Sequence, residues 1–249
     1  MSTVDELAAR WAEAERVVIL TGAGISTASG IPDFRSPGGR WERYQPVLIQ
    51  EFLAFEEKRA EYWRYKGETW RVIREAQPNA AHRALADLAV AGHVRLLVTQ
   101  NVDGLHERSG IPSELFVAIH GTDAWVQCLS CHRREPRDVA QRAWESGVAV
   151  PLCPCGAPWK PATISFGQGL VEVDLQRAFG EAASCDLFVA VGSSLVVGPI
   201  NEMFPIAARA GAATAILTAS STPFDAAAHW RIADPLERCL PEIARRVLA

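Results

Sequence analysis

The sequence predicts an α/β fold: a Rossmann-like parallel sheet domain with a smaller inserted zinc-ribbon/helical domain. Short apolar runs such as 17–20 and 186–191 alternate with segments of helical periodicity, which is the order of elements in a doubly wound sheet. Residues 123–161 interrupt this alternation and contain four of the six cysteines. These two observations predict the parallel sheet and the insertion, respectively.

The expected domain boundaries follow from these patterns. We expect the Rossmann-like domain to comprise residues 1–35, 76–122 and 162–249, with a helical insertion (cofactor loop and lid) at 36–75 and a zinc-binding module at 123–161. A chain of 249 residues can hold one sizeable core plus such a small module.

The first half of the chain predicts two helical regions around its strands. A capping box at Thr3–Glu6 predicts a helix leading into the strand at Val17. Residues 45–73 have helical periodicity and carry an aromatic stripe, which is either a core face or a lid lining a substrate channel. Its members are Phe52, Phe55, Tyr62, Trp63, Tyr65 and Trp70. Pro78-Asn79 then begins a helix that runs through Ala91 and precedes the strand 94–99.

The second half predicts the remainder of the sheet. A short apolar run at 115–119 precedes the insertion. The α/β pattern is expected to resume with 162–166, followed by a helix at 171–183 and the strand 186–191. A helix near 201–211, a strand at 213–217 and a last helix at 235–248 complete the chain.

Composition excludes several classes of protein. The chain is 49% hydrophobic and 22% charged, as ordinary globular proteins are. No apolar run approaches the roughly 18 residues that span a membrane, and the N-terminus has no signal-peptide pattern. We therefore expect a cytoplasmic protein without a membrane partner. The net charge of −4 gives no overall attraction to nucleic acid, so no nucleic-acid partner is expected; the oligomeric state stays open.

A glycine-rich stretch follows the first predicted strand. The small residues of Gly22–Ser26 allow backbone N–H groups to approach an anionic ligand at a helix start, as at a pyrophosphate site. A dinucleotide fingerprint would also have a glycine near Thr27 and an acidic residue about 20 positions later, and both are missing. Instead, a proline-stiffened turn carries Asp33, Phe34 and Arg35. The sequence therefore favours a nucleotide site with reactive residues at its edge over a dehydrogenase.

Histidines and polar residues follow the next strands. Residues 100–103 and His120 lie where strands end, at the sheet edge that binds ligands in α/β proteins. From spacing alone His120 is either a general base or a satisfied core histidine. We expect His82 to form a local hydrogen bond and His106 to fix its loop, rather than either to catalyse.

Four cysteines have the spacing of a metal site. Cys128-x-x-Cys131 and Cys153-x-Cys155 provide two thiolate pairs for one tetrahedral Zn²⁺ per chain. Four thiolates leave no open position for water, so the predicted zinc is structural. The second pair is tighter than the common two-residue spacing.

The two other cysteines, Cys185 and Cys239, have no such neighbours. We expect buried thiols there, with a redox role as the alternative.

Together with Phe166-Gly167 and Gly192-Ser-Ser-Leu195, these motifs resemble the sirtuins, the NAD-dependent protein deacylases; the ordered match runs from about residue 16 to residue 241. The resemblance implies a cleft between a large and a small domain, which NAD and an acylated-lysine protein or peptide enter from opposite sides. The NAD contacts that it implies are Gly22, Ala23, Gly24, Ser26, Asp33, Phe34, Arg35, Gln100, Asn101, Val102, Asp103, Gly192, Ser193, Ser194 and Thr218.

The resemblance also implies a reaction. His120 and Asn101 would be the catalytic residues, with His120 taking a ribose hydroxyl proton, and Phe166, Gly167 and Val196 would border the acyl-lysine tunnel. The products would be nicotinamide, deacylated lysine and O-acyl-ADP-ribose, with acetyl as the expected acyl group. The alternatives are protein ADP-ribosyl transfer or NAD hydrolysis in the same pocket, and a non-catalytic NAD-sensing module.

The chain departs from the sirtuin pattern at two further positions. Gln168 stands where many sirtuins have glutamate, and Thr218 stands where an asparagine usually contacts the adenosine ribose. The segment 59–63 is unlike the Tyr-x-x-Arg pattern of the desuccinylating branch, so we expect no strong preference for acidic acyl groups.

Overall fold

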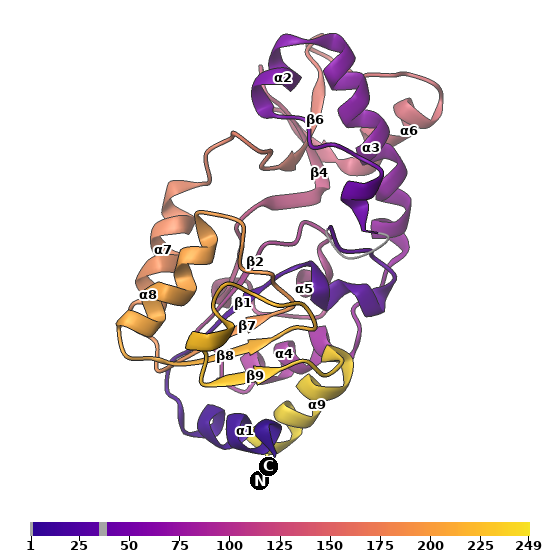
Figure 1. Ribbon diagram of the computed structural model, residues 1–249. Helices are drawn as coiled ribbons and strands as arrows, with labels where there is room; N and C mark the ends of the chain where they lie inside the picture. Colours follow the sequence, from indigo (N-terminus) through magenta and orange to yellow (C-terminus); the bar gives the residue numbers. More distant parts are fainter. Residues whose placement is uncertain (1, 35–38) are drawn as a thin grey trace.

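The computed structural model describes residues 2–34 and 39–249 (Figure 1). The α-helices are α1 Thr3–Glu13, α2 Ile49–Ala54, α3 Glu56–Glu75, α4 Ala80–Val90, α5 Leu105–Arg108, α6 Arg137–Glu145, α7 Glu172–Ala182, α8 Met203–Arg209 and α9 Leu236–Val247. The strands are β1 Val17–Thr21, β2 Leu96–Thr99, β3 Phe116–Ala118, β4 Gly121–Cys128, β5 Arg134–Pro136, β6 Trp159–Thr163, β7 Leu187–Val191, β8 Ala213–Leu217 and β9 Trp230–Ile232. Short 3-10 helices are η1 Ala23–Ser29, η2 Arg40–Glu42, η3 Ser113–Leu115, η4 Ile200–Glu202 and η5 Asp225–Ala227.

The larger sheet has six parallel strands in the order β3-β2-β1-β7-β8-β9. Its central strand β1 pairs with β2 through Val18 and Leu96, and with β7 through Val18 and Phe188. The chain builds outward from β1 through β2 and β3, and then crosses to β7 on the other side. The strand order therefore reverses between β1 and β7, which is where doubly wound sheets bind ligands.

Helices cover both faces of this sheet, because its strands are apolar on both sides. Val17 and Ile19 of β1 belong to a buried cluster with residues of α1, α4 and α9, whereas Val18 and Leu20 belong to a second cluster with residues of α7 and α8. Figure 1 shows α7 and α8 on one side of the sheet and α4 and α9 on the other. Each such aliphatic side chain contributes about 1.5–3 kcal/mol on full burial, so the sheet and its two helical layers form together.

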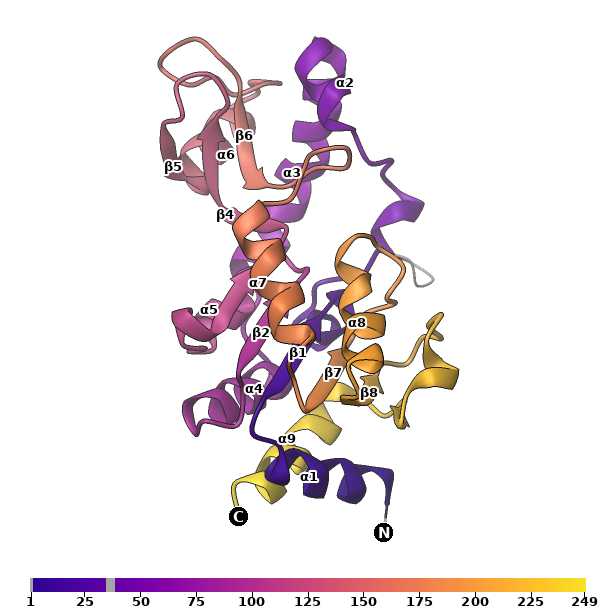
Figure 2. The same cartoon turned by 90° about the vertical axis from the view of Figure 1, so that its left-hand side faces the viewer.

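A smaller antiparallel sheet, in the order β5-β4-β6, lies away from α1 and α9. Two distant chain segments share its core: Phe52 and Trp63 pack in one cluster with Val126 and Trp159. The indole N–H of Trp63 donates to the carbonyl of Trp159 at 3.0 Å. Figure 2 shows β5, β6 and α6 beside α2 and α3. We call α2, α3, α6 and this sheet the small module.

The predicted α/β class is confirmed, and the structure corrects or refines three local expectations. The cap of α1 is Ser2, whose hydroxyl accepts from the N–H of Asp5, rather than a box over Thr3–Glu6. Residues 45–73 contain two helices separated at Phe55, which has extended backbone. The α/β pattern resumes only at α7, because β6 pairs with β4 in the small sheet instead of joining the large one.

The predicted domain boundaries stay predictions. The strands β4 and β6 extend beyond residues 123–161 at either end. Within residues 2–34 and 39–249, none of the helices combines the length and apolar character needed to cross a membrane.

Candidate active site

A cavity of about 340 Å³ opens at the carboxyl ends of β1, β2 and β7, where the strand order reverses. It continues to the small module, since residues of α3 and β6 also line it. The residues that the sequence predicted and that lie in its lining are Gly22, Ala23, Gly24, Ser26, Asp33, Phe34, Gln100, Asn101, Val102, Asp103, His120, Phe166, Gly167, Gly192, Ser193, Ser194 and Thr218.

The glycine-rich segment packs directly on the end of β7. Gly22 N–H donates to the carbonyl of Val191 at 2.9 Å, and Gly24 N–H donates to that of Gly192 at 2.8 Å. Gly192 has φ +62°, and a Cβ there would lie 2.4 Å from the backbone nitrogen of Ile25. Only glycine fits at this position. The segment opens the 3-10 helix η1 rather than the start of a longer α-helix.

A buried polar network joins this segment to the end of β2. The amide nitrogen of Asn101 donates to the carbonyl of Gly22 and to Ser26 Oγ, both at 3.1 Å. The Ser26 hydroxyl donates in turn to Asp103 Oδ2 at 2.8 Å, and Leu105 N–H donates to Asp103 Oδ1 at 2.9 Å. Burial raises the pKa of Asp103, an effect that these two hydrogen bonds partly offset. The network fixes the orientation of three polar side chains in the cavity wall.

His120 reaches the cavity from the loop between β3 and β4. Its Nδ1 lies 3.0 Å from the carbonyl oxygen of Gln100. A carbonyl can only accept, so Nδ1 carries the proton and Nε2 has the free lone pair. Burial lowers the pKa of His120, and the bond to Gln100 only partly opposes this. The imidazole is therefore neutral at pH 7, with a basic nitrogen available. Gln100 is itself fixed by donating from its amide to Ser193 Oγ at 2.8 Å.

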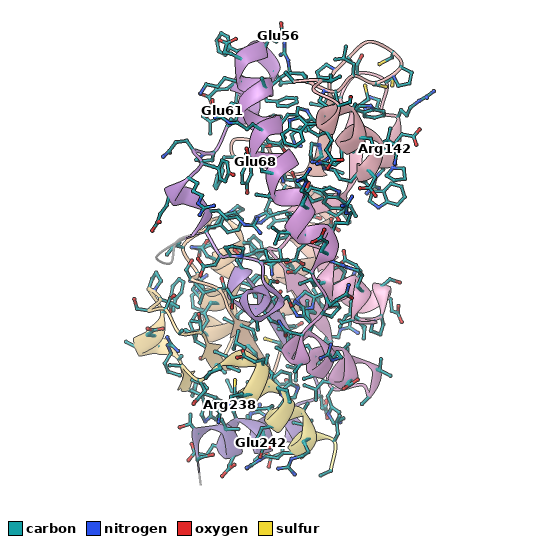
Figure 3. The ribbon with its side chains drawn as sticks, turned by 90° about the vertical axis from the view of Figure 1, so that its right-hand side faces the viewer. Glu56, Glu61, Glu68, Arg142, Arg238 and Glu242 are labelled. Carbon is teal, nitrogen blue, oxygen red and sulfur yellow. The ribbon has the colours of Figure 1, made fainter. Side chains whose placement is uncertain are left out.

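The far end of the cavity is lined by α3. Tyr62, Tyr65 and Lys66 form this wall. The Lys66 ammonium donates to Asp123 Oδ2 at 2.7 Å, and both side chains are buried. Arg137 of α6 approaches the other carboxylate oxygen at 3.6 Å. Figure 3 shows α3 beside α6, with Glu68 and Arg142 labelled on them.

The cysteine cluster has the dimensions of a tetrahedral thiolate site. The Sγ atoms of Cys128 and Cys155 are 3.5 Å apart, and those of Cys131 and Cys153 are 3.6 Å apart. All four lie within 4.8 Å of one another. A Zn–S length of 2.3 Å implies S–S separations of about 3.8 Å in a tetrahedron. The tight Cys153-x-Cys155 pair is thus compatible with one Zn²⁺.

Comparison with known proteins identifies the family. The model of the Sir2 family matches residues 22–199. The chain belongs to the Sir2 family. An "NAD-dependent protein deacetylase 1" of Bradyrhizobium diazoefficiens is 42% identical over 224 residues, 90% of this chain and 88% of the relative. An "NAD-dependent protein deacetylase" of Haloarcula marismortui is 37% identical over 249 residues, 98% of this chain and 95% of the relative.

Solved Sir2 structures have the same fold. A Sir2 complex with a deacetylated p53 peptide and 3′-O-acetyl ADP-ribose matches with a TM-score of 0.89 and 33% identity, covering 98% of this chain and 97% of that chain. A Sir2 complex with a p53 peptide and NAD⁺ matches with a TM-score of 0.87 and 33% identity, covering 100% of this chain and 98% of that chain. The predicted sirtuin resemblance is confirmed.

Of the predicted site residues of this Sir2-family chain, one described residue does not line the cavity, and one falls outside the described residues. Val196 is 48% exposed and does not line the cavity, although its neighbour Val197 does. Arg35 falls outside the described residues. Phe166 is 45% exposed at the rim, and its carbonyl accepts from the N–H of Ile49 at 3.0 Å, which attaches α2 to the rim.

The sequence left open whether the aromatic stripe of α3 is a core face or lines a channel, and it did not single out Lys66. The aromatic stripe divides into two faces, since Trp63 and Trp70 are buried in apolar clusters whereas Tyr62 and Tyr65 also line the cavity. The i, i+3, i+4 spacing of Tyr62, Tyr65 and Lys66 is the signal that could have identified this face.

Two further cysteines and two further histidines have the structural roles that the sequence favours. Cys185 and Cys239 are buried thiols, and burial raises the pKa of each to about 11, which disfavours the reactive thiolate. His82 accepts from the backbone N–H of Asn79, and His106 bonds to Thr21.

Proposed function

We propose that this Sir2-family protein removes acyl groups, acetyl foremost, from protein lysine side chains in a reaction that consumes NAD. The products are nicotinamide, deacylated lysine and O-acyl-ADP-ribose. The observation that carries the proposal is the neutral His120, whose free Nε2 belongs to the same cavity as the glycine-rich segment and Asp103. A general base and a nucleotide site thus share one cavity, as an acyl transfer to ADP-ribose requires.

The two walls of the cavity hold NAD. The small residues Gly22–Gly24 leave backbone close to the phosphates, and Gln100, Ser193 and Thr218 offer polar side chains to the riboses. The buried Asp103, already oriented by Ser26, receives the nicotinamide carboxamide. NAD supplies an electrophilic ribose carbon when its nicotinamide departs. Phe34, which also lines the cavity, excludes water from that carbon.

The protein contributes to acyl transfer through one atom that accepts a proton, Nε2 of His120. Because Nδ1 of His120 donates to Gln100, Nε2 accepts the proton of a ribose hydroxyl and leaves that oxygen able to attack the acyl group. Asn101 assists by holding Ser26 and the carbonyl of Gly22 in place. Overall, the ribose carbon that nicotinamide leaves would bond to the acyl carbonyl oxygen, the acyl group would pass from the lysine nitrogen to a ribose oxygen, one water would be consumed, and the proton would leave with the lysine amine.

The acylated lysine enters from the rim. We propose that Phe166 and Gly167 border the extended peptide and that Val196 lies on its other side. Gln168 removes a negative charge from this rim. At the far end of the cavity Lys66 is already neutralised by Asp123, which supports an acyl preference without a strong demand for acidic groups.

The four cysteines hold one structural Zn²⁺, which supplies no chemistry to the reaction but fixes the small module. We further propose that the described part of the predicted helical insertion, residues 39–75, folds as one unit with residues 123–161 around their shared apolar cluster, separate from the Rossmann-like domain. A cytoplasmic location stays a prediction from the sequence.

Mass spectrometry of a reaction with NAD and an acetyl-lysine peptide tests the function. Peptide-dependent nicotinamide release, matched by deacetylated peptide and O-acetyl-ADP-ribose, supports deacylation. Nicotinamide release without peptide indicates an NAD hydrolase, and an ADP-ribose mass added to protein indicates a transferase. If no product forms with acetyl, propionyl, butyryl or succinyl peptides although NAD binds, the protein is an NAD sensor.

A further inference from the structure

Two buried histidines near the cavity have no role in the reaction proposed above. His82 of α4 and His106 of α5 are 0% and 1% exposed, and their ring centroids are 4.9 Å apart. Among the described residues, neither Nε2 of His82 nor Nδ1 of His106 has a hydrogen-bond partner. Buried polar atoms in folded proteins are nearly always paired, so these two nitrogens require an explanation.

The proton of His106 can be located from its neighbours. The Thr21 hydroxyl donates to Thr99 Oγ1 at 2.8 Å. Thr21 Oγ1 can therefore only accept from His106 Nε2, which lies 3.0 Å away. Burial keeps the pKa of His106 well below its usual value, so the ring is neutral. Its Nδ1 is consequently an acceptor that lacks a donor.

The proton of His82 follows from the same reasoning. The backbone N–H of Asn79 donates to its Nδ1 at 3.4 Å. Burial, followed by the charges of Arg83 and Arg108, lowers the pKa of His82 to about 4. The neutral ring thus carries its proton on Nε2, which is a donor that lacks an acceptor. The unpaired donor of His82 and the unpaired acceptor of His106 are therefore on adjacent rings.

We propose that His82 and His106 are positioning residues joined by one hydrogen-bonded link, in which a single buried water accepts from Nε2–H of His82 and donates to Nδ1 of His106. The link completes a chain that passes from His106 through Thr21 to Thr99. Thr99 Oγ1 accepts the backbone N–H of Asn101 at 3.1 Å.

The other end of this chain reaches η1, which also contributes residues to the cavity lining. The Asn79 side chain donates to the carbonyl of Ile25 at 2.8 Å and to Ser29 Oγ at 3.0 Å, both in η1. The linked histidines therefore tie η1 to Asn101, the same two segments that the Asn101–Ser26 bond joins within the cavity. The effect of this link on catalysis rests on the proposed function, whereas the existence of the link does not.

The proton positions are tested by long-range ¹H–¹⁵N NMR of histidine-labelled protein at pH 7, with single variants to assign the rings. Both rings should be neutral with the proton on Nε2. A proton on Nδ1 of either ring, or a protonated imidazolium, overturns the proposal. This readout is independent of activity, so it stands even if deacylation fails.

Paired substitutions test the positioning role. His106→Gln keeps a donor near Nε2 for Thr21, whereas His106→Asn keeps only a group near Nδ1. We expect His106→Asn to lower kcat about tenfold, as the loss of one buried hydrogen bond allows, with the peptide KM unchanged, and His106→Gln to retain more of the rate. Equal rates for the two variants contradict the proposal.

A double-mutant cycle tests the link itself. His82→Asn removes its donor and His106→Gln removes its acceptor. The double variant should lose no more stability in urea, and no more kcat, than the worse single variant. Effects that simply multiply would show that the rings act independently and would overturn the link.

Discussion

Replacing Asp123 with asparagine removes a carboxylate that lies within a buried cluster of three cations. Lys66, Arg137 and Lys160 are all buried around it. The Asp123 carboxylate lies 2.7 Å from the ammonium of Lys66 and 3.6 Å from Nε of Arg137. Burial alone would raise the pKa of Asp123, but Lys66 and Arg137 outweigh this and hold the pKa below its usual value. The carboxylate is therefore charged throughout the physiological range.

The size of the effect follows from burial. Removing one partner of a buried ion pair costs about 3–5 kcal/mol, because the remaining charges lose their compensation. At roughly 2–4 °C per kcal/mol for a chain of this size, the melting temperature should fall by about 10 °C. The stabilisation is present above the unfolded-state pKa of about 3.9 and is lost only as pH falls through the lower folded-state pKa. The loss in Asp123→Asn should thus be the same at pH 6 and pH 8.

Thermal unfolding followed by tryptophan fluorescence measures this effect, since Trp63 packs against Arg137 with 4.7 Å from the ring centroid to the guanidinium carbon. The matched control is Glu242→Gln in α9, where Glu242 is labelled in Figure 3. Its carboxylate pairs with Arg245 and Arg246 at the surface. We expect no measurable change there. If Asp123→Asn melts within 2 °C of the native protein, at a scatter of about 1 °C, the reasoning on buried charge is refuted.

Four further predictions concern the site. His120→Ala should abolish deacylation while the zinc content and the circular dichroism stay unchanged; retained turnover would remove His120 from the mechanism. Since burial lowers the pKa of His120 and the neutral form is the base, kcat/KM should be flat above pH 7 and decline only below about pH 6.5, and a decline beginning near pH 8 would contradict this. Metal analysis should find about one zinc per chain, and Cys128→Ser should lose both the metal and the near-ultraviolet signal of the small module; a folded, metal-free native protein would exclude the site. Gly192→Ala, whose Cβ would lie 2.4 Å from a backbone nitrogen, should raise the KM for NAD and lower the melting temperature, and an unchanged KM would separate this glycine from NAD binding.

The sequence was sufficient for the large sheet and the cysteine cluster because both depend on local patterns. Buried parallel strands are continuous apolar runs, as in residues 17–21 and 187–191. Two closely spaced pairs of cysteines indicate a metal site from their spacing alone. The assignment of residues 162–166 to the large sheet failed for the opposite reason. Residues 159–163 pair antiparallel with residues 121–128, and no local pattern distinguishes the two sheets.

The candidate site shows the same division. Residues directly after strands, such as Asn101 and His120, could be predicted because strand ends converge at one edge. For Tyr62 the sequence left a core face and a channel lining as alternatives, and Lys66 was not identified, since only the tertiary arrangement decides which face of their helix meets the cavity. The hydrogen bonds from His106 through Thr21 to Thr99 could not be predicted from the sequence either, because both threonines fit the pattern of ordinary strand residues.

The shared core of the small module also sets an order of events during synthesis. Trp63 and Trp159, which hydrogen-bond to each other, are 96 residues apart, whereas the thiols of Cys128 and Cys155 are separated by only 27 residues. The ribosome therefore releases α3 with its indoles uncovered, and they remain so until the segment around residue 159 has emerged. Metal capture needs only short-range loop closure, but docking of α3 must wait for a long-range partner. Between these two positions the nascent chain carries the apolar face of α3 uncovered, and a chaperone can bind it there.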